Sequence, residues 1–101
     1  MDEESFVQYW YNEDVHDGRV LRLVQNADEL IVEIETQDGR RVSLQFSEVE
    51  SVIRNSPEGM LLYSLSEMKS TTPHRNFVFT NSNDDDGARL EIRARDLLRL
   101  S

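Results

Sequence analysis

The chain has 101 residues, of which 38% are hydrophobic and 31% are charged, and its formal net charge is −9 at pH 7. This length predicts a single domain, residues 1–101, with one hydrophobic core. The chain contains no cysteine, which excludes a disulfide framework and agrees with a cytoplasmic protein. No apolar run is long enough to span a membrane, and the start lacks the basic segment of a signal peptide.

The acidic residues are concentrated at the N-terminal end, where residues 1–18 contain six of them and no Lys or Arg. Nucleic-acid binding needs basic side chains that displace counterions from phosphates, so we expect no nucleic-acid partner. A negative field favours encounter with a basic protein. The alternative is that the acidic residues keep a small domain soluble.

Four of the eight aromatic residues lie within the first eleven positions: Phe6, Tyr9, Trp10 and Tyr11. Their spacing is typical of one face of an amphipathic helix that packs on a sheet. If these side chains are exposed instead, they form a contact surface for a partner, because aromatic rings provide large and rigid contact areas.

His16-Asp17-Gly18 follows, with Glu13 and Asp14 nearby. One imidazole and several carboxylates suggest a divalent metal, but a zinc site usually needs three or four protein ligands. We therefore expect a turn that begins a strand, with a hydrogen-bonded histidine and no metal.

Alternating hydrophobic and polar residues predict a mainly β fold of about six strands. The predicted strands are Val20–Val24, Leu30–Glu35, Val42–Phe46, Gly59–Leu65, Phe77–Thr80 and Arg89–Arg95. Residues 26–29 form the first predicted turn, and Asp38-Gly39 predicts a hairpin closed by a type I′ turn. We expect an antiparallel sheet or a partly open barrel with one or two short helices.

One of those helices is predicted over residues 47–56. Its apolar residues, at helical spacing, are Val49, Val52 and Ile53. Ser47 and Glu50 fit a capping box at its start. Pro57 disfavours the helical conformation in the residue before it and ends the helix.

Two polar loops are predicted, over Ser66–Asn76 and Asn81–Gly87. The second contains Asp84-Asp85-Asp86-Gly87, which suggests a calcium loop. If Gly87 takes the sixth position of that loop, Arg93 stands where the bidentate glutamate is required. We therefore expect an ordinary solvated hairpin loop.

Arg89, Arg93 and Arg95 occupy one face of the last predicted strand. Such a stripe can bind a carboxylate or phosphate through forked hydrogen bonds. The alternative is pairing on the solvated face of the sheet with Glu33, Glu35 or Glu91.

The sequence contains no catalytic motif for a serine or cysteine nucleophile, a phosphate loop, a zinc protease or a dinucleotide. We expect no enzymatic activity and no cofactor.

The first predicted strand is preceded by the run Tyr11-Asn12-Glu13-Asp14-Val15-His16-Asp17-Gly18-Arg19-Val20, and Leu44-Gln45-Phe46 with Val49 lies downstream. Over residues 9–53 the chain resembles small bacterial β-rich domains of uncharacterised function, some of them classed as immunity proteins of toxin systems. A His-Asp pair commonly opens the first strand of those domains, although Val15 stands where an aromatic residue is usual. The resemblance implies a compact sheet domain and no catalytic residues.

We expect a protein-binding domain, with immunity-like inhibition as its most specific form. The expected contact residues are Trp10, Tyr11, Glu13, Asp14, His16 and Asp17. One alternative is a small-ligand or anion-binding barrel that uses Arg89, Arg93 and Arg95. The other is a structural domain that forms a homodimer through an exposed strand edge.

Overall fold

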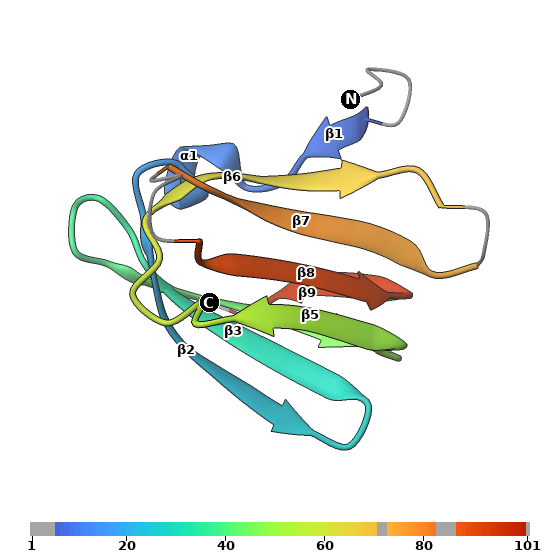
Figure 1. Cartoon of the computed structure of the whole chain (residues 1–101). Coiled ribbons are helices and arrows are strands. Elements are labelled where there is room, and N and C mark those ends of the chain that lie inside the picture. The colour runs from blue at the N-terminus through green and yellow to red at the C-terminus, as the bar shows by residue number, and fades with distance from the viewer. Residues whose placement is uncertain (1–5, 71–72, 83–86, 101) are drawn as a thin grey trace.

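The computed structural model describes residues 6–70, 73–82 and 87–100. In these residues the chain forms nine strands and one short helix (Figure 1). The elements are β1 (Phe6–Tyr9), α1 (Asn12–Val15), β2 (Arg19–Asn26), β3 (Glu29–Glu35), β4 (Arg41–Ser47), β5 (Ser51–Asn55), β6 (Leu62–Met68), β7 (Arg75–Asn81), β8 (Arg89–Ala94) and β9 (Asp96–Arg99). The prediction of a mainly β fold is confirmed.

The strands form two antiparallel sheets, one with the order β1-β6-β7-β8-β5 and the other with the order β2-β3-β4-β9. At one corner β8 is followed after Arg95 by β9, so consecutive strands lie in different sheets. At another corner Arg19 of β2 forms an isolated bridge with Leu61, just before β6. The two sheets do not form a closed barrel.

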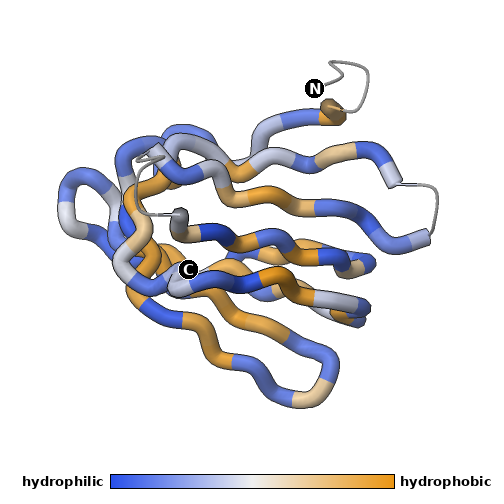
Figure 2. The backbone as a smooth tube through the Cα atoms, in the orientation of Figure 1, coloured by the Kyte–Doolittle hydropathy of each residue, from blue (hydrophilic) through white to orange (hydrophobic). Residues whose placement is uncertain are grey.

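The core lies between the sheets and follows from the alternation in the sequence. On β3 and β4 every second residue is buried, from Leu30 to Ile34 and from Val42 to Phe46. Figure 2 shows the corresponding alternation of hydrophobic and hydrophilic residues along the strands. The ring of Phe46 packs against Phe77 of β7 at a centroid distance of 5.2 Å. Each such buried side chain stabilises the fold by about 1.5–3 kcal/mol.

The hairpin predicted at Asp38-Gly39 is confirmed, because β3 and β4 pair from Leu30 to Glu35. Its turn differs from the predicted type I′ turn. Gly39 has a φ of 89°, whereas Asp38 is not in the left-handed region. The loop is closed by a hydrogen bond of 2.8 Å from the Thr36 amide to the Arg40 carbonyl. The loop is thus longer than the two-residue turn that type I′ geometry requires.

The helix predicted over residues 47–56 is wrong. β4 extends to Ser47, Glu48 adopts a φ of 52°, and β5 then pairs with β8. Val52 is half-buried and the adjacent Ile53 is exposed, as expected for a strand with one covered face. Valine and isoleucine fit a pleated sheet well, and pairing with β8 satisfies the backbone groups that a helix would satisfy internally.

The N-terminal aromatic residues do not form the predicted amphipathic helix. Residues Phe6–Tyr9 form β1, which pairs with the end of β6. Ser66 and Met68 belong to β6, so the polar loop predicted to begin at Ser66 starts later. The helix α1 follows β1 and has four residues. The added strands β1, β5 and β9 account for the difference from the six predicted strands.

The turn between β2 and β3 gives a test of backbone strain. Ala27 has a φ of 56°, and the left-handed region costs an L-residue with a Cβ about 1–2 kcal/mol. Glycine avoids this cost but loses more backbone entropy, so Ala27→Gly should raise the free energy of unfolding by about 0.5–1 kcal/mol. Urea denaturation measures the change. The control is Ala88→Gly, at a position outside the left-handed region, which should lower the free energy of unfolding. If both variants have a lower free energy of unfolding than wild type, the backbone strain at Ala27 is contradicted.

Candidate functional site

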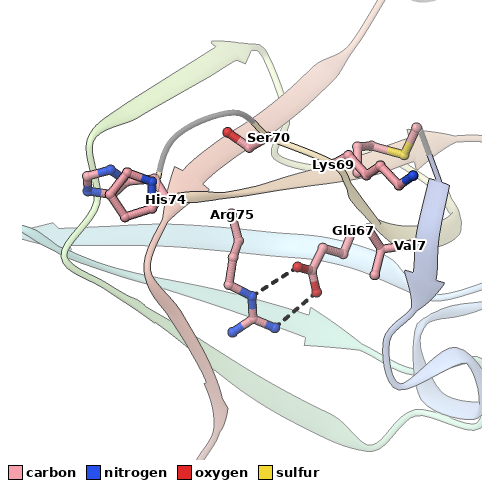
Figure 3. A pocket seen from close by; sticks show the side chains of 8 residues that line it. Val7, Glu67, Lys69, Ser70, His74 and Arg75 are labelled. Atoms are coloured by element: carbon pink, nitrogen blue, oxygen red, sulfur yellow. Dashed lines mark hydrogen bonds and ion pairs between the residues drawn. The ribbon is translucent and has the colours of Figure 1, made fainter. Parts of the chain in front are cut away.

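Trp10 turns from the end of β1 toward the core and joins an ion pair. Its amide donates to the Leu65 carbonyl at 2.9 Å, and its indole Nε1 donates to Glu67 Oε1 at 3.0 Å. Arg75 donates to both carboxylate oxygens of Glu67, each at 3.0 Å (Figure 3). The Arg75 guanidinium also lies over the rings of Trp10 and Phe77, at 5.5 and 5.1 Å. Trp10 is therefore partly buried and anchors the N-terminal segment.

Asp14 of α1 is largely covered and is paired with two arginines of the chain. Its side chain is 14% exposed and forms ion pairs with Arg40, at 2.9 Å, and with Arg99. Arg40 lies in the loop between β3 and β4, and Arg99 lies on β9, with its guanidinium 5.8 Å from the ring centroid of Tyr11. The hydrogen bond from Arg99 lowers the pKa of Asp14, in opposition to burial, and the hydrogen bond from Arg40 lowers it further. Tyr11 and Asp14 thus connect α1 to the four-stranded sheet.

His16-Asp17-Gly18 forms a turn that fixes α1 against β6. The Asp17 amide donates to the Leu62 carbonyl at 2.9 Å, and His16 Nδ1 donates to the Tyr63 carbonyl at 2.9 Å. His16 Nε2 lies 3.6 Å from Asp17 Oδ2. Asp17 adopts a φ of 63°. The prediction of a strand-initiating turn with a hydrogen-bonded histidine is confirmed.

The exposed aromatic side chains gather where β1 and β6 pair beside α1. We call the surface formed by Phe6, Tyr9, His16 and Tyr63 the aromatic edge. Phe6, Tyr9 and Tyr63 are 39%, 53% and 52% exposed. The rings of Phe6 and Tyr9 lie 4.7 Å apart, and those of His16 and Tyr63 lie 5.3 Å apart in an edge-to-face arrangement. Glu13 is exposed and comes shortly before His16 in the chain, and the exposed Asp17 follows it.

A small pocket lies within the aromatic edge. It has a volume of about 130 Å³ and is lined by Tyr9, Asn12, His16, Tyr63 and Ser64. Tyr63 lies within the predicted strand Gly59–Leu65 and was not among the expected contact residues. The register of β6 shifts between Leu62 and Ser64, and this irregularity accompanies the outward position of Tyr63.

A larger pocket, of about 270 Å³, opens beside the end of β6 (Figure 3). Its lining residues are Val7, Glu67, Met68, Lys69, Ser70, Pro73, His74 and Arg75. Figure 3 shows Lys69 and His74 on either side of the Glu67–Arg75 pair. Glu67 neutralises Arg75, and Glu50 lies 3.6 Å from His74. The charges around this pocket are nearly balanced, so they do not select an anion.

The arginine stripe is paired with carboxylates of the chain. The pairs are Arg89–Glu91, Arg93–Glu50 at 3.5 Å and Arg95–Glu48 at 3.8 Å. Of the three glutamates predicted as partners, Glu91 is confirmed. Glu33 instead pairs with Arg22 at 2.9 Å, and Glu35 also lies on β3, in the other sheet. Pairing on the sheet surface is therefore the arrangement that the structure shows.

Among residues 6–70, 73–82 and 87–100, no three or more His, Asp or Glu side chains are grouped to hold a metal ion. The Asp84-Asp85-Asp86 part of the possible calcium loop lies outside these residues. In the same ranges no helix has the length and apolar character needed to cross a membrane.

The chain matches no protein-family profile, no curated protein and no solved structure.

The Glu67–Arg75 pair predicts how stability depends on pH. Hydrogen bonds from Arg75 lower the pKa of Glu67 below its ordinary value of 4.5, in opposition to burial, and the bond from Trp10 adds to the effect. A carboxylate whose pKa falls on folding stabilises the native state fully above its ordinary pKa. That contribution is lost as the pH falls through the lower pKa of the folded state.

Glu67→Gln should therefore lower the free energy of unfolding at neutral pH by about 1–2 kcal/mol, and the difference from wild type should shrink below pH 4.5. Urea denaturation at a series of pH values measures it. Glu58→Gln removes the exposed pair with Arg54 and should change stability by less than about 0.5 kcal/mol. A constant difference between Glu67→Gln and wild type at every pH would contradict this prediction.

Gly18 permits the close approach of α1 to β3. A Cβ at this position would lie 3.0 Å from the carbonyl oxygens of both Glu35 and Val15, and backbone atoms cannot move aside as a flexible side chain can. Gly18→Ala should lower the free energy of unfolding by about 1–3 kcal/mol, as measured by urea denaturation. Gly59→Ala meets no atom within 4 Å but has a φ of +88°, so it measures a backbone cost alone. Unchanged stability of Gly18→Ala would contradict the close contact.

Proposed function

We propose that this chain is a protein-binding domain without enzymatic activity, and that it contacts a basic protein through the aromatic edge and the adjoining Glu13 and Asp17. The observation that carries the proposal is the gathering of three exposed aromatic side chains, Phe6, Tyr9 and Tyr63, on one edge of the molecule. Tyrosine is enriched among the residues that dominate binding energy at protein interfaces. Exposed rings contribute little to the stability of the isolated domain, because they remain in water. The same rings provide a large apolar contact area to a binding partner.

The charge of the chain supports a basic partner. The formal net charge is −9, and the exposed Glu13 and Asp17 lie in the segment that carries the aromatic edge. Complementary charges accelerate encounter and suppress unsuitable partners. The proposed contact leaves out Asp14, since Arg40 and Arg99 already bind its carboxylate.

Residues 9–53 resemble small bacterial β-rich domains of uncharacterised function, some of them classed as immunity proteins, and an inhibitory form of the proposed function follows from that resemblance. A basic surface on a protein commonly serves to bind an anionic molecule such as a nucleic acid. An acidic domain that covers such a surface excludes the anionic molecule by charge and by volume. In this form of the proposal, binding of the chain stops the activity of its partner.

Paired charge variants test the proposal. Capture from the source lysate at about 0.05 M and about 0.5 M salt identifies a partner that the chain loses at high ionic strength. With that purified partner, Glu13→Lys combined with Asp17→Asn should slow association on the order of 3- to 10-fold at low salt, as measured by surface plasmon resonance. Asparagine is chosen at position 17 because, like aspartate, it tolerates the left-handed backbone found there.

Glu29→Lys combined with Asp28→Asn provides the matched control, because it changes the net charge by the same amount at exposed residues of the β2–β3 turn, which lies away from α1 (Figure 1). It should leave association nearly unchanged. Equal association rates for all three proteins would show that Glu13 and Asp17 do not form the contact. Recovery of a second copy of the chain, together with concentration-dependent sedimentation, would favour self-association through a strand edge instead.

A further inference from the structure

We propose that the pocket in the aromatic edge binds one lysine or arginine side chain of the partner. This inference rests on the proposed function and specifies its central contact. The pocket volume of about 130 Å³ is well below the roughly 300–1,000 Å³ of sites for drug-sized ligands. It therefore suits the end of a single side chain that projects from a larger surface.

The walls of the pocket are held in place by contacts within the chain. His16 is fixed by its hydrogen bond to the Tyr63 carbonyl and by edge-to-face contact with the Tyr63 ring. Tyr9 is positioned by the pairing of β1 with β6, where it lies opposite Ser66, and its ring contacts that of Phe6. A preformed pocket loses little conformational entropy when a side chain enters it.

The faces of aromatic rings attract cations, and this chain already uses that attraction on neighbouring residues. Arg75 lies over Trp10, and Arg99 lies over Tyr11, at 5.5 and 5.8 Å from the ring centroids. In the described part of the chain no arginine or lysine lies over the ring of Tyr9 or Tyr63, and both side chains are about half exposed. These two rings remain open to a cation from another molecule.

The acidic surroundings favour a cation over an apolar side chain. The Asp17 carboxylate lies 3.6 Å from His16 Nε2, next to a wall of the pocket. A lysine or arginine head group in the pocket would gain attraction from this carboxylate, whereas an apolar side chain would not.

The first test uses the isolated protein and a small probe. Nα-acetylarginine amide is titrated into the full chain while the ring signals of Tyr9, His16 and Tyr63 are followed by NMR. We expect saturable shifts at these three residues with a dissociation constant on the order of millimolar. The matched probe is Nα-acetylcitrulline amide, which has nearly the same shape and no charge. Equal shifts with both probes, or no shifts with either, would overturn the inference.

The second test replaces the rings. Tyr63→Phe keeps the aromatic face and should keep the affinity for the arginine probe, whereas Tyr63→Leu keeps apolar volume and should weaken it about 3-fold. Leu98→Ala, at another exposed apolar position, should have no effect. Equal affinity in the Tyr63→Phe and Tyr63→Leu variants would overturn the cation-binding role.

The same variants, measured with the partner, separate the two proposals. If Tyr63→Leu leaves partner binding unchanged while the Glu13 and Asp17 substitutions weaken it, the proposed function stands and the pocket contact is overturned. If neither set of substitutions changes partner binding, the proposed function itself fails.

Discussion

The position of the N-terminal segment depends on the contact between Trp10, Glu67 and Arg75. A carboxylate that is largely removed from water is costly unless hydrogen bonds and an opposite charge replace its hydration, and here Arg75 supplies both. The Trp10 indole adds a third donor to the same carboxylate. β1 has only four residues and occupies the edge of its sheet, so its ladder with β6 is short. The hydrogen bond of Trp10 to Glu67 therefore holds β1 against β6. This position of β1 places Phe6 and Tyr9 in the aromatic edge.

The acidic residues that precede β2 divide into two structural groups. Asp14 links α1 to the loop between β3 and β4 and to β9, while Glu13 and Asp17 keep exposed side chains. In the sequence these carboxylates look equivalent, but their free energies of hydration differ in the folded protein. An acidic residue that already has two arginine partners has little charge left for another molecule. Of these three acidic residues, Glu13 and Asp17 are therefore the ones we include in the proposed contact, because their carboxylates are exposed in the segment that carries the aromatic edge.

The parts of the fold that sequence reasoning predicted depend on local pattern. β3 and β4 alternate strictly, and one slip of register would move every core residue to the surface, so the pattern determines both strands. β1, β5 and β9 are stabilised by partners far along the chain, and the spacing of Phe6, Tyr9 and Trp10 matches a helix equally well. For the candidate site, His16 and Asp17 were found from their position before a strand. Tyr63 was missed because the irregularity in β6 that accompanies its exposure depends on pairing, not on composition.

The ion pair between Asp14 and Arg99 joins residues 85 positions apart. A contact across so long a stretch of chain forms late, because the intervening segments must first be ordered to bring its ends together. During synthesis α1 leaves the ribosome long before β9, which carries Arg99. In the same way, β1 cannot form its ladder until β6 has been synthesised. The exposed rings at the N-terminal end therefore spend the early part of synthesis without the sheet that positions them. The proposed contact surface needs β1, α1 and β6, so its rings can reach their final positions only after β6 has been synthesised.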